Sequence, residues 1–264
     1  MQRFSLFPGL LAAFVLAAGI LAVGPFSVLA DDPPSKQSVK PPVKQPTKPR
    51  YETREDHDPD GIGKFYLGRE IAWVMGHQAS GWLDRPEREK EEAPAKLIKA
   101  LNVKQGMVIA DIGAGSGYHS LRLAPLVGEK GKILAVDIQQ EMLDLIKKKA
   151  EKQSIKNVEL LKGSETDPKL PKEEVDLILL VDVYHEFSHP YEMTEKMVAS
   201  LKPGGRIAFV EFRLEDATVP IKLVHKMTER QVILEMAEFP NMEHEKTIET
   251  LPWQHIVLFK KKAK

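Results

Sequence analysis

Five short runs of aliphatic residues recur between residues 107 and 210, and amphipathic segments separate them. Continuous runs of Val, Ile and Leu are typical of strands that are buried on both faces of a parallel sheet. The segments between them suit helices, as in residues 141–146, which lead into a lysine-rich end that complements a helix C-terminus. The alternation predicts βαβ units and an α/β fold with a doubly wound sheet. The five expected strands lie at 107–110, 132–136, 158–161, 175–181 and 206–210.

Two flanking regions complete the expected organisation. After the fifth strand we expect a helix and two closing strands, one of them antiparallel, at 227–239, 246–251 and 255–259. Ahead of the first strand we expect helices at 66–78 and 93–101. The sequence therefore predicts an N-terminal helical cap over residues 51–100 and a core domain over residues 101–264.

Residues 1–30 have the composition of a targeting segment. Arg3 is their only charge, and a long apolar stretch leads to Val-Leu-Ala, where Ala30 offers a small side chain to a signal peptidase. We expect cleavage near Ala30 and export to the periplasm or another extracytoplasmic space. The alternative is membrane association through an uncleaved anchor at residues 4–30, because roughly 20 apolar residues suffice to span a bilayer. The cations that follow would then keep the domain in the cytoplasm.

Residues 31–50 hold six prolines and five basic residues, which is typical of a Pro/Lys-rich linker with polyproline II character. The whole chain has 38 residues of each sign, and residues 1–50 carry six cations and two carboxylates, which leaves 32 basic and 36 acidic residues. A domain with a net charge of −4 lacks the positive surface that nucleic-acid phosphates require. The chain has no cysteine, so disulfides and thiolate chemistry are also excluded.

The strongest chemical signal is the segment Asp-Ile-Gly-Ala-Gly-Ser-Gly at residues 111–117, between an expected strand and an expected helix. Its glycines let the backbone turn sharply and approach a ligand, and the next helix offers free N–H groups. Asp137 ends the following strand, 24 positions beyond Gly113, where a carboxylate can accept hydrogen bonds from both hydroxyls of a ribose. Together they predict a cofactor that contains a nucleoside.

Two details favour a nucleoside cofactor other than NAD. A dinucleotide-binding loop would need glycine at position 118, where the chain has Tyr118. Asp111 lies two residues before the first glycine, where it could hold the ammonium group of an amino-acid moiety. S-adenosylmethionine joins an amino acid to adenosine, so it is the cofactor that we expect.

With these residues the chain resembles the class I S-adenosylmethionine-dependent methyltransferases, in particular their small-molecule, type 11-like branch. The resemblance rests on residues 111–117, 135–137 and 201–206 and covers most of residues 93–212. It implies a Rossmann-like sheet of seven strands in the order 3-2-1-4-5-7-6, with strand 7 antiparallel and helices on both faces. It also implies methyl transfer by direct displacement. The expected cofactor-binding residues are Asp111, Gly113, Gly115, Gly117, Asp137, Ile138, Glu165 and Asp182.

Glu165 marks a departure from the family pattern. Many relatives carry Gly-Asp or Gly-Asn after the third strand to contact the adenine amine, whereas this chain reads Gly-Ser-Glu at 163–165. The Glu165 carboxylate could accept that hydrogen bond. The resemblance also implies that the end of the fourth strand, from Asp182 onwards, faces the methyl group.

The residues after the fourth strand are the candidates for catalysis. His185 is the candidate base, because its imidazole is neutral near physiological pH. Glu186 and Tyr184 are lesser candidates, and the alternative is that His185 only packs in the loop and no base is used. His77 and Arg85 in the N-terminal cap are candidate contacts for a small or medium-sized methyl acceptor.

His185 also begins the segment His-Glu-Phe-Ser-His, which matches the H-E-x-x-H zinc motif. An apolar strand precedes it and Pro190 follows it, so the required helix is not expected, and the sequence predicts no metal site. The alternative function is a non-catalytic S-adenosylmethionine-binding sensor or scaffold of the cell envelope, because an exported enzyme lacks an obvious supply of the cofactor. We expect no nucleic-acid partner and no obligate protein partner.

Overall fold

The computed structural model describes residues 49–263. The expected targeting segment at 1–30 lies outside the described residues, as does the linker up to residue 48. Within the described part, no helix is both long enough and apolar enough to cross a membrane.

The strands are β1 (Tyr51–Thr53), β2 (Gly61–Tyr66), β3 (Arg69–Ala72), β4 (Val108–Ile112), β5 (Lys132–Asp137), β6 (Val158–Lys162), β7 (Val175–Val181), β8 (Leu201–Phe212), β9 (Met242–Ile248) and β10 (Gln254–Lys261). The helices are α1 (Ser80–Leu83), α2 (Arg88–Glu91), α3 (Pro94–Leu101), α4 (Tyr118–Val127), α5 (Gln140–Lys152), α6 (Pro190–Ser200) and α7 (Glu229–Met236), with short 3-10 helices η1 (His77–Ala79), η2 (Tyr184–Glu186) and η3 (Leu223–His225).

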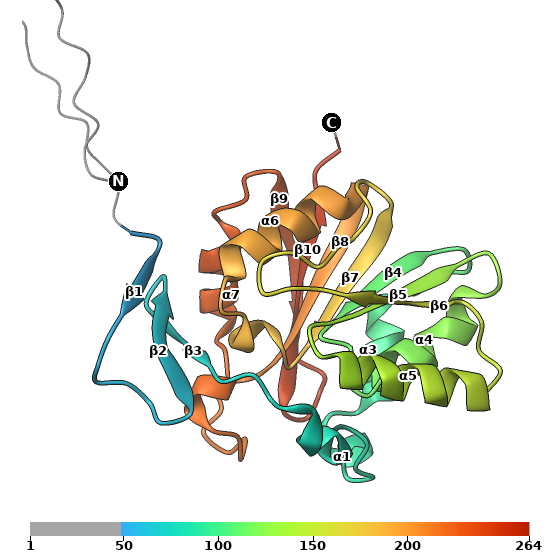
Figure 1. Cartoon of the computed structure of the whole chain (residues 1–264). Coiled ribbons are helices and arrows are strands. Elements are labelled where there is room, and N and C mark those ends of the chain that lie inside the picture. The colour runs from blue at the N-terminus through green and yellow to red at the C-terminus, as the bar shows by residue number, and fades with distance from the viewer. Residues whose placement is uncertain (1–48, 264) are drawn as a thin grey trace, which may run out of the picture. The chain divides into compact units, whose positions relative to one another are not determined.

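The expected seven-stranded sheet is confirmed (Figure 1). Its order is β6-β5-β4-β7-β8-β10-β9, which becomes 3-2-1-4-5-7-6 when the strands are numbered from β4. Strands β4 to β8 pair in parallel, and β10 runs antiparallel to both of its neighbours. The segment at 201–206, which carries part of the family resemblance, belongs to β8, whose register against β7 shifts between Val175 and Leu177.

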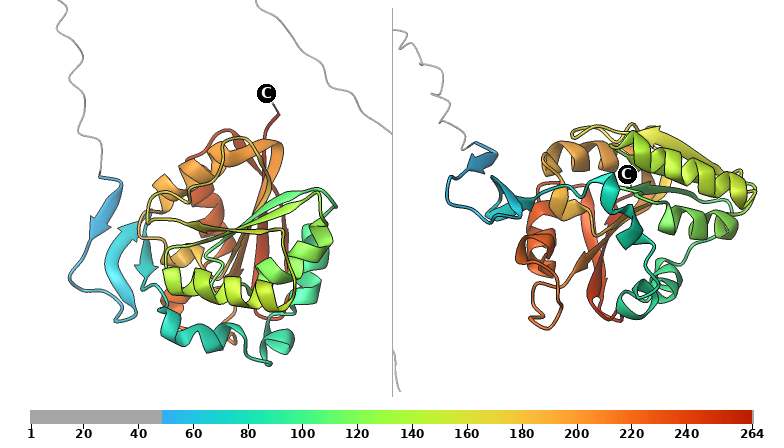
Figure 2. Two further views of the ribbon diagram at one scale, coloured as in Figure 1. Left: turned by 45° about the vertical axis from the view of Figure 1, so that its right-hand side comes forward. Right: turned by 60° about the horizontal axis from the view of Figure 1, so that its bottom comes forward.

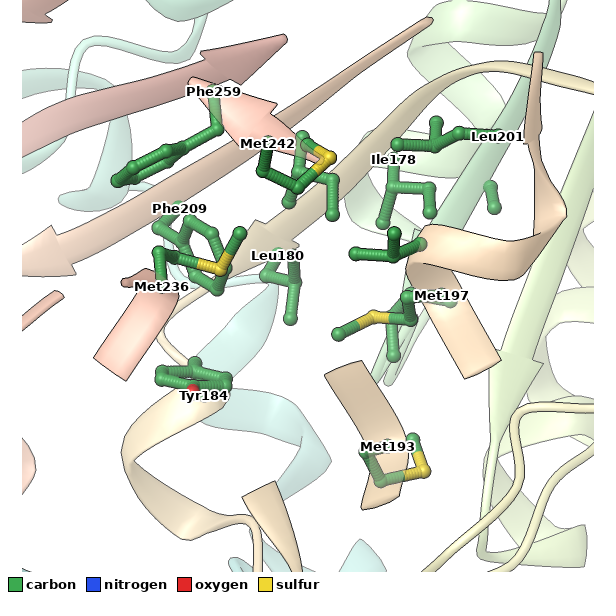
Figure 3. Close-up of a cluster of buried hydrophobic side chains, with 14 of the residues drawn as sticks. Ile178, Leu180, Tyr184, Met193, Met197, Leu201, Phe209, Met236, Met242 and Phe259 are labelled. Atoms are coloured by element: carbon green, nitrogen blue, oxygen red, sulfur yellow. The ribbon is translucent and has the colours of Figure 1, made fainter. Parts of the chain in front are cut away.

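Alternate side chains of the central strands face two hydrophobic layers. Ile178 and Leu180 of β7 pack with α6 and α7 on one face, and Leu177 and Leu179 pack with α3 and α4 on the other. Helix α5 packs beside α4, against β5 and β6. Figure 3 shows the first layer, in which methionines of α6 and α7 surround the aliphatic residues of the sheet. Burial on both faces, worth about 1.5–3 kcal/mol for each large aliphatic side chain, explains the continuous apolar runs of the sequence.

The N-terminal part differs from the helical cap that we predicted. Residues 66–78, expected as a helix, contain the end of β2, a two-residue turn and β3. Leu67 and Gly68 have φ values of 47° and 90°, as the tight turn of a β-hairpin requires. The prediction was wrong because leucine is an unusual residue for such a turn. The helix expected at 93–101 is confirmed as α3.

A three-stranded antiparallel sheet, β1-β2-β3, therefore lies ahead of the core (Figure 2). It contacts α6 and α7. Tyr51 donates a hydrogen bond to Glu192 of α6, and Arg69 of β3 pairs with the fully buried Glu235 of α7 at 2.7 Å. The chain then crosses the carboxyl ends of the parallel strands before it enters α3.

Candidate active site

A cavity of about 410 Å³ lies at the carboxyl ends of β4, β5 and β7. The order of the sheet reverses between β4 and β7, and such switch points are where open α/β sheets bind their ligands. The N-terminal segment forms the opposite wall. Its contributions are Val74, Met75, Trp82, Leu83, Arg85, Arg88 and Glu92. We call this cavity the cofactor pocket.

The glycine loop between β4 and α4 forms one wall of the cofactor pocket. Gly113 and Gly115 line it with positive φ values of 65° and 54°. A Cβ atom on Gly113 would lie 2.3 Å from Cγ2 of Val183, and one on Gly115 would lie 2.6 Å from Leu83. Gly117 also has a positive φ, but it lies at the start of α4, against Ile146 and away from the pocket wall. The loop therefore needs glycine both for its conformation and for the close approach of neighbouring segments.

Asp137 lies in the pocket wall as expected, and Ile138 lines the pocket beside it. One carboxylate oxygen of Asp137 accepts a hydrogen bond from the N–H of Gly115 at 2.9 Å, and the other accepts from the N–H of Gln139 at 2.8 Å. Each oxygen keeps a lone pair for a further donor. Burial raises the pKa of Asp137, although these N–H donors favour its charged form. The carboxylate thus fixes the glycine loop and can still accept hydrogen bonds from two hydroxyls.

Asp111 differs from the other expected cofactor residues. Its side chain is buried beneath the loop and accepts a hydrogen bond from the Ser120 hydroxyl at 2.6 Å. It does not line the cofactor pocket. Burial raises its pKa to about 6, despite the hydrogen bonds from Ser120. The structure therefore gives Asp111 a supporting position behind the loop rather than a place in the wall.

Asp182 and Glu165 both line the pocket. Asp182 has a positive φ of 50°, a conformation that costs a non-glycine residue roughly 1–3 kcal/mol and is often found at functional sites. Its Oδ2 atom accepts a hydrogen bond from Gln254 at 2.6 Å, but its buried Oδ1 atom has no partner within residues 49–263. Burial, with Glu92 and Glu211 nearby, raises the pKa of Asp182 well above its usual value. This orphaned oxygen suits a bound positive group or hydrogen-bond donor.

His185 also lines the pocket, and a carboxylate that we did not predict holds it in place. The Nδ1 atom of His185 lies 2.6 Å from the fully buried Glu211 of β8. Burial alone would lower the pKa of His185, but the Glu211 carboxylate more than offsets this and raises it. Glu211 also accepts the backbone N–H of Tyr184 at 3.0 Å. A single acidic residue at the end of the apolar β8 run is the sequence signal that could have revealed it.

His225 is the second residue that sequence reasoning missed. It follows the segment that lines the pocket at Pro220, Ile221 and Lys222. Its Nδ1 atom lies 3.2 Å from Nε2 of His185, and the two rings meet edge to face. No local pattern marks this histidine, because its partner lies 40 positions earlier in the chain. Burial and the neighbouring His185 lower its pKa to about 4.

Glu186 lines the pocket and links it to the N-terminal segment. Its Oε1 atom accepts the backbone N–H of Met75 at 3.2 Å, and burial raises its pKa to about 7. Gln139 makes two further bonds to this segment, with the Met75 carbonyl and the His77 N–H. The His77 side chain does not line the pocket, whereas Arg85 does and pairs with Glu91 and Glu92.

One prediction about this region is wrong. Tyr184 does not line the pocket: its ring is fully buried in the hydrophobic core beside Phe209 (Figure 3). The ring also packs against Phe187, so it cannot touch a substrate. The H-E-x-x-H segment does not form one helix, as expected, and its second histidine, His189, lies beside Glu165 and Tyr51 instead of beside His185. The segment bends because η2 ends at Glu186 and α6 starts only at Pro190.

The described residues fit S-adenosylmethionine. The glycine loop leaves space for a ligand, Asp137 offers acceptors for ribose hydroxyls, and the orphaned Asp182 oxygen offers an acceptor for a cationic group. Ile138 provides an apolar surface at the rim, where it is 38% exposed. A pocket of this size is ordinary for a small-molecule site.

Comparisons with known proteins agree with this geometry. The chain matches a family model described as a methyltransferase domain over residues 103–258. The crystal structure of a SAM-dependent methyltransferase from Aquifex aeolicus is 29% identical, with a TM-score of 0.67, over 71% of this chain and 100% of that one. A putative type 11 methyltransferase from Sulfolobus solfataricus, 24% identical with a TM-score of 0.53, shares the fold over 66% of this chain and 95% of its own.

Curated relatives point the same way. The demethylmenaquinone methyltransferase of Lactococcus lactis is 28% identical over 127 residues, 48% of this chain and 50% of its own length. The enzyme of the same name from Oceanobacillus iheyensis is 30% identical over 43% of this chain and 48% of its own length. The chain thus spans about half the length of the curated relatives that it matches.

The strand order, the glycine loop and the Asp137 carboxylate in the pocket wall are together typical of α/β proteins that bind a nucleoside-containing cofactor. The chain belongs to the class I S-adenosylmethionine-dependent methyltransferases, with a type 11-like methyltransferase domain. Its cofactor is S-adenosylmethionine.

Proposed function

We propose that this methyltransferase modifies a small or medium-sized acceptor, which binds in the part of the cofactor pocket between His185, His225 and residues 220–222. The observation that carries this proposal is the extension of the pocket beyond the glycine loop to these residues. Apolar walls at Phe187 and Phe212 adjoin the two histidines, so this part offers a few polar groups within an apolar enclosure. Such a combination is typical of sites for small organic molecules.

The chain's own residues have distinct parts in the reaction. Asp137 orients the ribose, and Asp182 and Glu165 supply acceptors near the cationic and adenine parts of the cofactor. S-adenosylmethionine supplies an electrophilic methyl group: its C–S bond breaks, a bond forms between that carbon and the acceptor atom, and sulfur keeps the electron pair. The pocket contributes chiefly by holding the acceptor in line at near-attack distance.

His185 is the group placed to take the acceptor's proton. Its Nδ1–H donates to Glu211, so its Nε2 atom faces the pocket as the basic nitrogen. Because Glu211 raises the pKa of His185, the imidazolium formed after proton uptake is stabilised. Glu186 lies beside His185, and its carboxylate also favours the charged form of the imidazole. Relatives named demethylmenaquinone methyltransferase support an acceptor that is a small molecule.

The test is methyl transfer from methyl-labelled S-adenosylmethionine to separated fractions of a cell extract. The proposal expects label in the small-molecule fraction and none in protein or RNA. An Asp137→Ala variant controls for transfer by contaminating enzymes. Label in a macromolecular fraction would contradict the proposal. Absence of turnover in a folded protein that binds the cofactor would instead support the sensor or scaffold alternative.

We also propose that residues 1–30 direct export and are removed near Ala30, with residues 31–50 as the spacer before the folded domain. The apolar stretch and the small residue at position 30 support this proposal. Mass measurement of the intact protein from fractionated cells tests it. A mass that begins at Asp31 in an extracytoplasmic fraction is expected. A full-length mass in the membrane fraction would favour the anchored alternative.

A further inference from the structure

Three side chains of the cofactor pocket bring metal-ligating atoms together. His185, Glu186 and His225 each offer one such atom, and these atoms all lie within 4.8 Å of one another. Two of them come from η2, after β7, and the third from η3, so the fold assembles the group from distant parts of the chain. All three line the pocket on the side proposed for the acceptor. We call this group the His-Glu-His cluster.

The geometry of the two imidazoles suits an ion. Nε2 of His185 and Nδ1 of His225 are 3.2 Å apart. With zinc–nitrogen bonds of about 2.0–2.1 Å, two nitrogens at this spacing subtend roughly 100° at the metal, close to a tetrahedral angle. The Oε1 atom of Glu186 lies 4.0 Å from the same His225 nitrogen, so a small rotation of its side chain completes a three-ligand set.

Glu211 provides the support that metal-binding histidines normally have. It accepts the Nδ1–H of His185 at 2.6 Å, which leaves Nε2 without a proton and directed at the cluster. A carboxylate behind a ligating histidine fixes its tautomer and makes it a stronger ligand. Glu186 and Glu211 are both carboxylic acids, so in their charged forms they would balance the two positive charges of a divalent cation.

From this arrangement we infer that the His-Glu-His cluster binds one divalent transition-metal ion of the zinc type, which holds the acceptor. Two imidazoles and one carboxylate are the donors that zinc, cobalt and iron prefer, whereas magnesium prefers oxygen ligands. Three protein ligands leave a coordination position open toward the pocket, as in catalytic rather than structural zinc sites.

The inference rests on the proposed function and changes one part of it. With the ion bound, His185 is a ligand instead of a base. An acceptor hydroxyl that binds at the open position becomes more acidic, and its proton leaves to solvent before the methyl group is transferred. The site is distinct from the H-E-x-x-H arrangement, because His225 takes the place that His189 would have in that motif.

The experiment is calorimetric titration of the chelator-treated full chain with Zn²⁺, Co²⁺ and Mg²⁺. We expect one Zn²⁺ or Co²⁺ per chain, a visible absorption band for the bound Co²⁺, and no binding of Mg²⁺. His225→Ala should abolish binding, and Glu211→Gln should weaken it by about 10- to 100-fold, as for other carboxylates behind ligating histidines. His189→Ala is the matched control and should bind as the unmodified chain does.

Two results would overturn the inference: no stoichiometric Zn²⁺ binding by the folded chain, or equal binding by the His225→Ala variant. If His225→Ala does not fold, as judged by circular dichroism, Glu211→Gln decides the question, and unchanged affinity in that variant refutes the inference. S-adenosylmethionine binding is measured in the same samples. A chain that binds this cofactor but no metal disproves the metal site alone, whereas a folded chain that binds neither disproves the proposed function as well.

Discussion

Replacing Gly113 with alanine gives the most local test of how the glycine loop forms the pocket. The new Cβ atom would lie 2.3 Å from Cγ2 of Val183 and 3.0 Å from its Cβ. Carbon atoms in contact normally lie about 3.5–4.0 Å apart, so the loop or Val183 must move by more than about 1 Å. Both residues line the pocket, and the movement therefore also changes the place of the cofactor.

Two costs add in this variant. A left-handed backbone conformation costs an alanine about 1–2 kcal/mol, and the overpacking costs about 1–3 kcal/mol. Gly113→Ala should thus lower the free energy of unfolding by roughly 2–5 kcal/mol. A control variant at Gly106 distinguishes the backbone cost from the overpacking cost. Gly106 has a φ of 83°, and nothing lies within 4 Å of the position that a Cβ atom would take there. Gly106→Ala should show the backbone cost alone.

Urea unfolding, followed by circular dichroism, measures the stability of each variant, and calorimetry measures S-adenosylmethionine binding. We expect Gly113→Ala to weaken binding at least about tenfold, or 1.4 kcal/mol, and Gly106→Ala to leave it unchanged. Adding Val183→Ala to Gly113→Ala should recover part of the lost stability and affinity. A double-mutant cycle then measures the interaction energy between positions 113 and 183. The reasoning is refuted if the two glycine variants lose equal stability and bind the cofactor equally well.

Three further predictions concern single residues. Asp137→Ala should weaken S-adenosylmethionine binding about 100-fold or more, since two hydrogen bonds to a charged acceptor are lost at about 1.5–3 kcal/mol each; calorimetry showing equal affinity would refute the role of Asp137. Tyr184→Phe should leave methyl transfer unchanged, because the ring lies in the core; a large loss of kcat would return Tyr184 to the catalytic candidates. Asp111→Asn should change how stability depends on pH, because the folded state keeps the Asp111 proton up to about pH 6 and the unfolded chain loses it near pH 3.9. The unmodified chain therefore loses up to about 3 kcal/mol of stability as pH rises from 4 to 7, and urea unfolding of the Asn variant across this range should lack that loss.

The sheet could be predicted from the sequence because its strands are buried on both faces, as the apolar run of β7 illustrates. The glycine loop and Asp137 could be predicted because neighbouring parallel strands bring their carboxyl ends together. The hairpin at Leu67 and Gly68 was missed because its turn rests on a backbone conformation that leucine rarely adopts.

The acceptor side could be predicted only in part. His185 and Glu186 follow a recognisable strand, but Tyr184 shares the same segment and faces the core, since adjacent residues of η2 point in different directions. Glu211 and His225 reach His185 through tertiary packing over 26 and 40 positions. The local pattern marks Glu211 as an acidic residue at the end of an apolar run, but it does not tell which distant residue Glu211 or His225 contacts.

Calorimetry on the full chain with S-adenosylmethionine, S-adenosylhomocysteine and NAD in parallel tests the central claim most directly. The account predicts binding of the first two ligands, no binding of NAD, and loss of both interactions in the Asp137→Ala variant. A folded chain that binds neither S-adenosyl compound, or one that binds NAD at the same site, would contradict it.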